Sequence, residues 1–207
     1  MSRILVICIC FICGCVPVAN PQKPESAVAF MSPRSVSGLL RVEWRVGNLT
    51  SFGTGFLVAN NGRDYLITAA HIVEDETGKL YLMFEDGTPV PFTAKRMYKE
   101  KGLDAVAVEV ADVPSFVPRY TTGILGVGDT VAAYGFPEAK GRFEVRGDVV
   151  TRVIEASCRI QNGMSGGPLM VNGKVVGVLS SRVFKSDGTE ASIHSDMTDV
   201  LGMINGR

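Results

Sequence analysis

Short runs of alternating apolar and polar residues, separated by turn signals, are the feature that most constrains the fold of this chain. The first run, GLLRVEWRV, places Leu40, Val42, Trp44 and Val46 on one face of an expected strand. Asn60-Asn61-Gly62 and Asn172-Gly173 each stand between two apolar runs, as hairpin turns do. Several short strands spaced by roughly ten residues predict an all-β barrel or sandwich.

The remaining strands are expected in five further stretches. These are KLYLMFEDGTPVPFTAKRMY, which repeats the hairpin pattern around Asp86-Gly87, then LDAVAVEV, DTVAAYGF, FEVRGDVVTRVIEASC and PLMVNGKVVGVLSSR. A proline-containing link at about residues 111–124 divides the strands into two halves of similar size. Only the tail, HSDMTDVLGMI, indicates a helix, with Ser195 or Asp196 as the N-cap.

Composition excludes several classes of function. The 207 residues are 46% hydrophobic and 20% charged, which is typical of a globular protein and not of a disordered one. Lys+Arg and Asp+Glu both number 21, so no basic surface indicates a nucleic-acid partner. Only two histidines are present, and without a third plausible ligand they make a poor zinc site. We expect neither a metal nor a cofactor.

The N-terminus reads as an export signal. Four of the five cysteines lie in the first fifteen residues, MSRILVICICFICGC, where a short cationic start precedes an apolar run. The run is too short to span a bilayer as a helix. Its end resembles a bacterial lipobox, so we expect a lipoprotein-type signal peptide at 1–15 with lipidation at Cys15. Cleavage near Ala19, or another membrane-proximal use, is the alternative. Residues 16–35 are expected to form a flexible tether.

The stretch NGMSGGPLMV displays Ser165 in a glycine-rich loop, and two further residues complete a possible catalytic set. His71 ends the apolar run YLITAAH, and Asp104 opens LDAVAVEV. A serine hydroxyl needs an adjacent base to act as a nucleophile, histidine has a suitable pKa, and a carboxylate orients the imidazole. Glycines allow successive backbone N–H groups to point at a developing oxyanion. Asp75 is a weaker candidate for the acid.

Each of these signals has a structural alternative. A histidine at a strand end is more often polar surface, and a glycine-rich turn with a serine is more often only a turn. We interpret Cys158 as core filler and not as a second nucleophile. His194 is expected at the surface or at the helix entry.

Together the motifs resemble the chymotrypsin-fold, or trypsin-like, serine proteases. TAAH at 68–71 and GMSGGP at 163–168 match the blocks around the catalytic histidine and serine, although Met164 stands where the family has Asn or Asp. SFGTGFLV, VGDTVAAYGFPE, RIQNGMSGGPL and GKVVGVLSS are similar to the bacterial HtrA-like (Deg-type) branch. The similarity covers about residues 36–204, which leaves no room for the PDZ domain of typical members.

The resemblance implies a fold of two six-stranded antiparallel β-barrels with the active site between them and a short C-terminal helix. The expected limits are about 36–112 for the first barrel, 124–194 for the second and 195–204 for the helix, within a protease domain at 36–204. It also implies that Ser165 is the nucleophile, His71 the general base and Asp104 the orienting acid. The N–H groups of Gly163 and Ser165 would form the oxyanion hole.

The resemblance further implies a substrate site. The backbone of Leu179, Ser180 and Ser181 would bind a substrate strand by β-augmentation. Residues 158–161, with Arg159, Ile160 and Gln161 among them, would wall the S1 pocket together with Ser180. Arg159 either points inward and favours an acidic P1 residue or points outward and leaves a small apolar pocket. We expect the second, because burying an unpaired guanidinium is costly.

The sequence therefore predicts an exported serine endopeptidase that works through an acyl-enzyme on protein or peptide substrates. It would be a cell-envelope lipoprotein at the membrane or otherwise periplasmic or secreted. The alternative is a catalytically silent or partner-activated peptide-binding module of the same fold.

Overall fold

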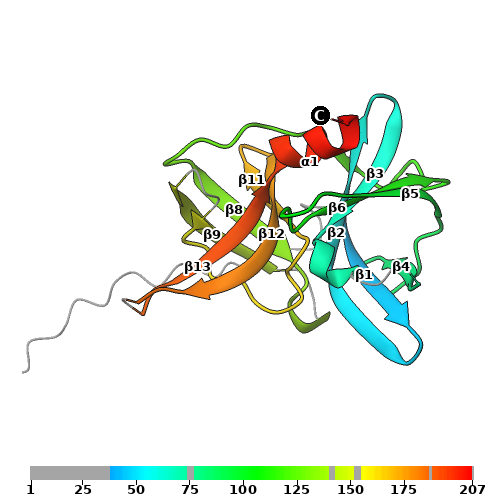
Figure 1. Cartoon of the computed structure of the whole chain (residues 1–207), viewed down its shortest axis with the longest axis horizontal. Coiled ribbons are helices and arrows are strands. Elements are labelled where there is room, and N and C mark those ends of the chain that lie inside the picture. Colours follow the sequence, from blue (N-terminus) through cyan, green and yellow to red (C-terminus); the bar gives the residue numbers. More distant parts are fainter. Residues whose placement is uncertain (1–37, 74–76, 140–142, 152–154, 187, 207) are drawn as a thin grey trace, which may run out of the picture.

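The computed structural model describes residues 38–73, 77–139, 143–151, 155–186 and 188–206. The expected signal peptide at 1–15, the tether at 16–35 and the alternative acid Asp75 lie outside these residues. Within them the chain forms two β-sheets that lie side by side, with one helix resting on both (Figure 1).

The first sheet contains the N-terminal strands. In chain order they are β1 (Leu39–Val46), β2 (Leu49–Asn60), β3 (Arg63–Thr68), β4 (Lys79–Met83), β5 (Thr93–Lys99) and β6 (Val106–Ala111). Their spatial order is β4-β1-β2-β3-β6-β5, with every neighbouring pair antiparallel. The two-residue strand β7 (Arg119–Tyr120) joins β2 in parallel, and the 3₁₀ helix η1 (Ala70–Ile72) follows β3.

The second sheet is a closed barrel. Its strands are β8 (Thr130–Gly135), β9 (Phe143–Thr151), β10 (Glu155–Ala156), β11 (Pro168–Val171), β12 (Lys174–Phe184) and β13 (Glu190–Asp196). Their order around the barrel is β10-β13-β12-β11-β8-β9. The 3₁₀ helix η2 (Pro137–Ala139) follows β8, and the helix α1 (Met197–Asn205) ends the chain. The predicted fold class, two antiparallel β-barrels with a short C-terminal helix, is confirmed.

Local sequence explains the tight turns. Asn61 and Gly62 both have positive φ, as do Asn172 and Gly173, so both predicted hairpins use two-residue turns of the kind that matches strand twist. At the start of α1 the Asp196 side chain accepts a hydrogen bond from Thr198 N at 2.7 Å, which selects Asp196 over Ser195 as the N-cap.

The hairpin expected around Asp86-Gly87 forms, because Phe84 N donates to Thr88 O and Val90 N donates to Leu82 O, each at 2.8 Å, and Met83 pairs with Pro89. It is shorter than the pattern suggests: β4 and β5 do not pair with each other, since β4 pairs with β1 and β5 with β6, at opposite ends of the sheet order. The stretch EASIHSD, which is not among the expected strands, forms β13. Alternation predicts that a segment is a strand, but it does not specify the partner, which depends on long-range packing.

Three apolar clusters hold the sheets in place. One fills the first sheet, with Leu40, Leu57 and Leu66 at its centre, and one fills the second barrel, with Val131, Leu169 and Leu179. A third joins the two sheets and α1, because Phe56 and Ile67 share it with Val178, Met197 and Val200. Each such buried side chain contributes roughly 1.5–3 kcal/mol. This shared cluster holds residues of the two sheets in a defined relative position.

Among the described residues, α1 is the one α-helix, and no helix there is long and apolar enough to cross a membrane.

Candidate active site

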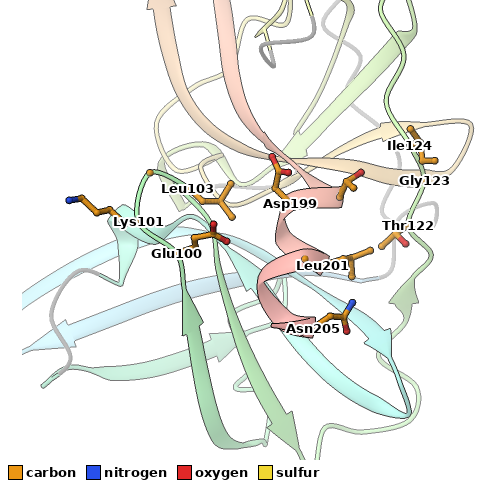
Figure 2. A pocket seen from close by; sticks show the side chains of 12 residues that line it. Glu100, Lys101, Leu103, Thr122, Gly123, Ile124, Asp199, Leu201 and Asn205 are labelled. Carbon is orange, nitrogen blue, oxygen red and sulfur yellow. The ribbon is translucent and has the colours of Figure 1, made fainter. Parts of the chain in front are cut away.

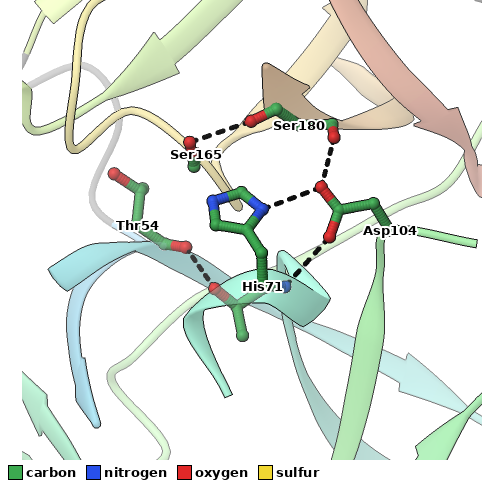
Figure 3. Close-up of polar contacts among 6 residues, drawn as sticks. Thr54, His71, Asp104, Ser165 and Ser180 are labelled. Atoms are coloured by element: carbon green, nitrogen blue, oxygen red, sulfur yellow. Dashed lines mark hydrogen bonds and ion pairs between the residues drawn. The ribbon is translucent and has the colours of Figure 1, made fainter. Parts of the chain in front are cut away.

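His71 and Asp104 form a hydrogen-bonded pair at one end of the neighbouring strands β3 and β6 in the first sheet. His71 lies in η1, just after β3, and Asp104 lies just before β6. Because β3 and β6 are neighbours with Thr68 opposite Val106, the two loops emerge side by side. Asp104 Oδ2 is 2.8 Å from His71 Nδ1, and Asp104 Oδ1 accepts a bond from the backbone N–H of His71 at 3.0 Å (Figure 3).

The electrostatics of Asp104 suit an orienting carboxylate. Burial by itself would raise its pKa, but hydrogen bonds from the His71 side chain, the Ser180 hydroxyl and the His71 backbone outweigh burial and lower the pKa below the usual value. The Ser180 hydroxyl donates to the same Oδ2 that faces the imidazole. Asp104 is therefore ionised at neutral pH and holds His71 by two separate bonds, one to the imidazole and one to the backbone N–H.

Ser165 lies in a loop that enters β11 and is held by backbone hydrogen bonds from two strands. Thr54 N in β2 donates to Ser165 O at 2.8 Å. Gly166 N donates to Leu179 O at 2.7 Å, and Leu179 N donates to Gly167 O at 2.8 Å, so the loop is also tied to β12. Gly166 has φ +82°, and a Cβ there would lie 2.2 Å from Thr54 O. Only glycine satisfies both the conformation and the space.

The Ser165 hydroxyl faces the Ser180 carbonyl in this structure. Ser165 Oγ donates to Ser180 O at 2.9 Å, while the imidazole lies between Ser165 and Asp104 (Figure 3). A hydroxyl has a single proton to donate. Passing that proton to His71 therefore requires a rotation of the Ser165 side chain away from Ser180.

The backbone around Gly163 sets the direction of the N–H groups of Gly163 and Ser165. Gly163 has φ +90° in a turn closed by Met164 N and Gln161 O at 3.1 Å. Asn162 O accepts from Glu138 N at 2.8 Å, and Met164 O accepts from Gly167 N at 2.9 Å. The C=O and N–H of a trans peptide point in opposite directions. Fixing these two carbonyls therefore fixes the N–H groups of Gly163 and Ser165.

The residues expected to bind substrate are found in different environments. Arg159 is largely exposed, with 63% of its side chain accessible, and its Nε lies 2.8 Å from Glu190 Oε2. The Ile160 side chain is buried in the core of the second barrel. Gln161 and Ser181 are exposed, and Gln161 closes the turn at Gly163.

Leu179 and Ser180 have roles that the resemblance did not assign. The backbone N–H and C=O of Leu179 are both used on Gly167 and Gly166, and its side chain lies in the barrel core. Leu179 therefore holds the Ser165 loop, and its paired backbone is not open to a substrate strand. Ser180 contacts Asp104 through its hydroxyl and Ser165 through its carbonyl.

His194 was expected at the surface or at the helix entry; it is buried, and it stands two residues before Asp196, the N-cap of α1. It lies in β13 opposite Leu179 and is 2% exposed, and both ring nitrogens are buried without a hydrogen-bond partner among the described residues. Burial lowers the pKa of His194 to about 4, so the ring is neutral at physiological pH. Cys158 is also buried, with its Sγ 3.8 Å from Val145 O, in keeping with a packing role.

Sequence reasoning missed two residues that contact the Ser165 loop. Glu138 has left-handed backbone angles, φ 49° and ψ 33°, and donates its N–H to Asn162 O. Thr54 is completely buried in β2 and contacts both Gly163 and Ser165. Neither residue type is a catalytic signal by itself. The one available hint was the GTG pattern at 53–55, in which a polar residue stands between two glycines just before the apolar run FLVA.

A separate groove does not include the Ser165 loop. It has a volume of about 840 Å³ and is lined by α1, the loop 100–103 and the segment 122–124 (Figure 2). Leu103, which directly precedes Asp104, is the lining residue nearest in sequence to His71, Asp104 or Ser165. No group of three or more potential metal-ligating side chains occurs within the part of the chain that the structure describes.

Comparison with known proteins places this geometry in context. The family described as the trypsin-like peptidase domain matches residues 53–178. The chain is 32% identical over 149 residues to a probable periplasmic serine endoprotease DegP-like of Chlamydia pneumoniae, covering 66% of this chain and 30% of that protein. It is 29% identical over 148 residues to the serine protease Do-like HtrA of Bacillus subtilis, covering 61% of this chain and 32% of that protein. The chain thus spans about a third of the length of these relatives.

Solved structures share the fold. The crystal structure of the Rv3671c protease in an inactive form superposes with a TM-score of 0.64 at 16% identity, covering 83% of this chain and 89% of that one. The serine endoprotease from Yersinia pestis gives 0.67 at 18% identity, covering 84% and 63%. At these identities the likeness concerns the fold alone.

Proposed function

We propose that this chain, which belongs to the trypsin-like peptidase family on its HtrA/DegP-like side, is a serine endopeptidase with a His71, Asp104 and Ser165 triad. The observation that carries the proposal is the pairing of Asp104 with His71 at 2.8 Å, beside a glycine-rich loop that presents Ser165. A binding module of the same fold has no need for an ionised carboxylate held against an imidazole by this geometry.

The proposed reaction proceeds by an acyl-enzyme. The Ser165 hydroxyl turns from Ser180 to His71, which takes its proton as Ser165 Oγ attacks the peptide carbonyl carbon. Asp104 stabilises the imidazolium, and the N–H groups of Gly163 and Ser165 bind the oxyanion. The imidazolium then protonates the leaving amine, and the C–N bond breaks to leave an ester on Ser165. Water, deprotonated by His71, hydrolyses the ester and regenerates the hydroxyl.

The proposed P1 preference is for a small apolar side chain. Arg159 supports this preference because its guanidinium is exposed and paired with Glu190. An arginine that is already neutralised at the surface offers little attraction to an acidic P1 residue. Gln161 and Ser181 are both exposed and are proposed to contact substrate. Gln161 lies close to Ser165 in the sequence, and Ser181 lies in β12, to which the Ser165 loop is tied.

We also propose that the protein is exported, with lipidation at Cys15 attaching it to a bacterial envelope membrane. The periplasmic relatives support export, and the lipobox-like end of the first fifteen residues supports the lipid. Metabolic labelling with an azido fatty acid, compared between wild type and Cys15→Ala, tests the second claim. Equal labelling of the two would reject lipidation at Cys15.

Covalent labelling with a fluorophosphonate probe, read by intact mass, tests the catalytic proposal. The expected result is one probe mass on the wild type and none on Ser165→Ala, with His71→Ala labelled far more slowly. A folded wild type that does not label would contradict constitutive catalysis. If added peptides then allowed labelling, the partner-activated alternative would be supported. If the peptides bound but no labelling followed, the catalytically silent module would be supported.

A further inference from the structure

Thr54 places one buried hydroxyl between two segments of the second barrel. Its side chain, from β2 of the first sheet, is fully buried. Thr54 Oγ1 donates to Gly163 O at 2.8 Å and accepts a bond from Phe136 N at 3.0 Å. These partners are 109 and 82 positions away in the sequence. The hydroxyl therefore uses its one proton on the turn before Ser165 and a lone pair on the end of β8.

The backbone of Thr54 contacts the same region. Its N–H donates to Ser165 O at 2.8 Å, and its carbonyl accepts from the buried Thr68 hydroxyl at 2.7 Å. All three polar groups of this residue are therefore satisfied, and three of its four hydrogen bonds reach the second barrel. Such a fully connected buried network favours one arrangement over its alternatives, because any change leaves a buried polar group without a partner.

We propose that Thr54 is a positioning residue that holds the turn at Gly163 in the conformation required of the oxyanion hole. The inference rests on the proposed function, since it concerns the N–H groups of Gly163 and Ser165. Thr54 touches no reacting atom and acts only through Gly163, Ser165 and Phe136.

The physical reason lies in the glycine. Gly163 has access to both signs of φ, so the peptides on either side of it can reorient at low cost unless other groups hold them. Glu138 N holds the preceding peptide through Asn162 O, and Thr54 Oγ1 holds the following one through Gly163 O. Thr54 also bonds Phe136, two residues before Glu138, so both restraints depend on the same short segment.

Removing the hydroxyl at constant shape would release this turn. In Thr54→Val the methyl groups keep the packing, but Gly163 O and Phe136 N lose their partner in a buried site. The turn would then sample orientations in which the Gly163 N–H is not available to an oxyanion. Thr54→Ser keeps the hydroxyl and loses only a methyl group, so it should restore the turn.

The test compares Thr54→Val and Thr54→Ser with a control variant, Val110→Ala. Val110 is buried in the first sheet and lies opposite Asp64, at the start of β3. For Thr54→Val we expect kcat on a peptide substrate to fall roughly 10- to 100-fold, with KM nearly unchanged. This loss is smaller than the loss that follows removal of an oxyanion-hole donor itself. Thr54→Ser should recover most of kcat. Val110→Ala should lose stability yet keep wild-type kcat in its folded fraction. A folded Thr54→Val with wild-type kcat would overturn the proposal.

Hydrogen exchange provides a readout that does not depend on catalysis. The Phe136 amide, which donates to Thr54 Oγ1, should exchange faster in Thr54→Val but not in Thr54→Ser or Val110→Ala. Unchanged protection in Thr54→Val would also overturn the inference. If the wild type does not react with fluorophosphonate but the Phe136 exchange result holds, the proposed function would be rejected and the structural role of Thr54 would be retained.

Discussion

The two halves of the molecule hold the residues of the proposed triad in different ways. In the first sheet, His71 and Asp104 follow or precede neighbouring strands, and hydrogen bonds to the Asp104 carboxylate hold them together. In the second barrel, Ser165 stands on a loop whose shape depends on glycines with positive φ and on backbone bonds to Thr54 and Leu179. The acid–base side is therefore organised by side chains and the nucleophile side by the main chain.

This difference predicts different consequences of mutation. A substitution of His71 or Asp104 should lower activity and leave the fold intact, because strands β3 and β6 pair without those two side chains. A substitution in the Ser165 loop should affect fold and chemistry together, because the same backbone bonds join the two sheets. Four experiments follow in order of decreasing expected effect. Those on Asp104, Gly166 and Ser180 test this contrast, and the one on His194 tests a buried ring outside both sides.

Replacing Asp104 with Asn should give the largest loss of activity at little cost in stability. The amide keeps the size of the side chain but can donate to His71 Nδ1, which favours the wrong tautomer. We expect kcat to fall by about 10⁴-fold. Asp64→Asn, which removes a partly exposed carboxylate paired with Arg119 in the same sheet, is the control and should keep its kcat. Measured kcat and melting temperature check this, and unfolding of Asp104→Asn would contradict the contrast.

Gly166→Ala should disturb fold and activity together. Gly166 and Gly128 have nearly equal φ values, +82° and +86°, but a Cβ at Gly128 meets nothing within 4 Å, whereas at Gly166 it would lie 2.2 Å from Thr54 O. Gly128→Ala should cost about 1–2 kcal/mol for its backbone conformation. Gly166→Ala should cost roughly 3 kcal/mol or more, since overpacking adds to that conformational cost. Urea denaturation measures the loss of stability in both variants. Equal losses would show that a Cβ at position 166 does not meet Thr54 O closely.

His194 should make stability depend on pH in the acidic range. Its folded pKa of about 4 lies below the ordinary value of 6.5. Above pH 6.5 both states are neutral and His194 contributes nothing. Between pH 6.5 and 4 the unfolded chain binds a proton that the folded chain does not, so stability falls as the pH falls. The full effect is roughly 3 kcal/mol.

The matched variant for this effect is His194→Leu. It should lose the His194 part of the pH dependence, whereas His71→Ala should retain it, because only His194 is buried. Denaturation curves at pH 7 and pH 4.5 measure the difference. An identical pH dependence in wild type and His194→Leu would show that the ring is not kept neutral by burial.

Ser180→Ala should have the smallest effect, because it removes one of the bonds to Asp104 and leaves the Ser180 backbone in place. A hydrogen bond to a charged group is worth about 1.5 kcal/mol or somewhat more, so we expect roughly a tenfold fall in kcat. The pKa of Asp104 should rise, since one cause of its depression is lost. Ser186→Ala, at an exposed hairpin tip, should match wild type. A larger loss than in Asp104→Asn would reject this role.

Much of the fold could be predicted from local pattern. The strand GLLRVEWRV, both Asn-Gly hairpins and the Asp196 cap follow from side-chain alternation and turn chemistry, which act over a few residues. The pairing of β4 with β1 and the burial of His194 in β13 could not be predicted in this way. Strand partners and burial depend on contacts between distant segments, on which a local pattern carries no information.

The candidate site divides in the same way. Residue types and motifs by themselves determined which side chains are proposed to carry the chemistry: a serine among glycines, one histidine at a strand end and one carboxylate before a strand. Only the tertiary structure decided how they are held. Thr54, Leu179 and Ser180 act through bonds to residues far away in the chain, and the two sheets must pack before those bonds exist. Side-chain chemistry is a property of single residues, whereas their positioning is a property of the packed molecule.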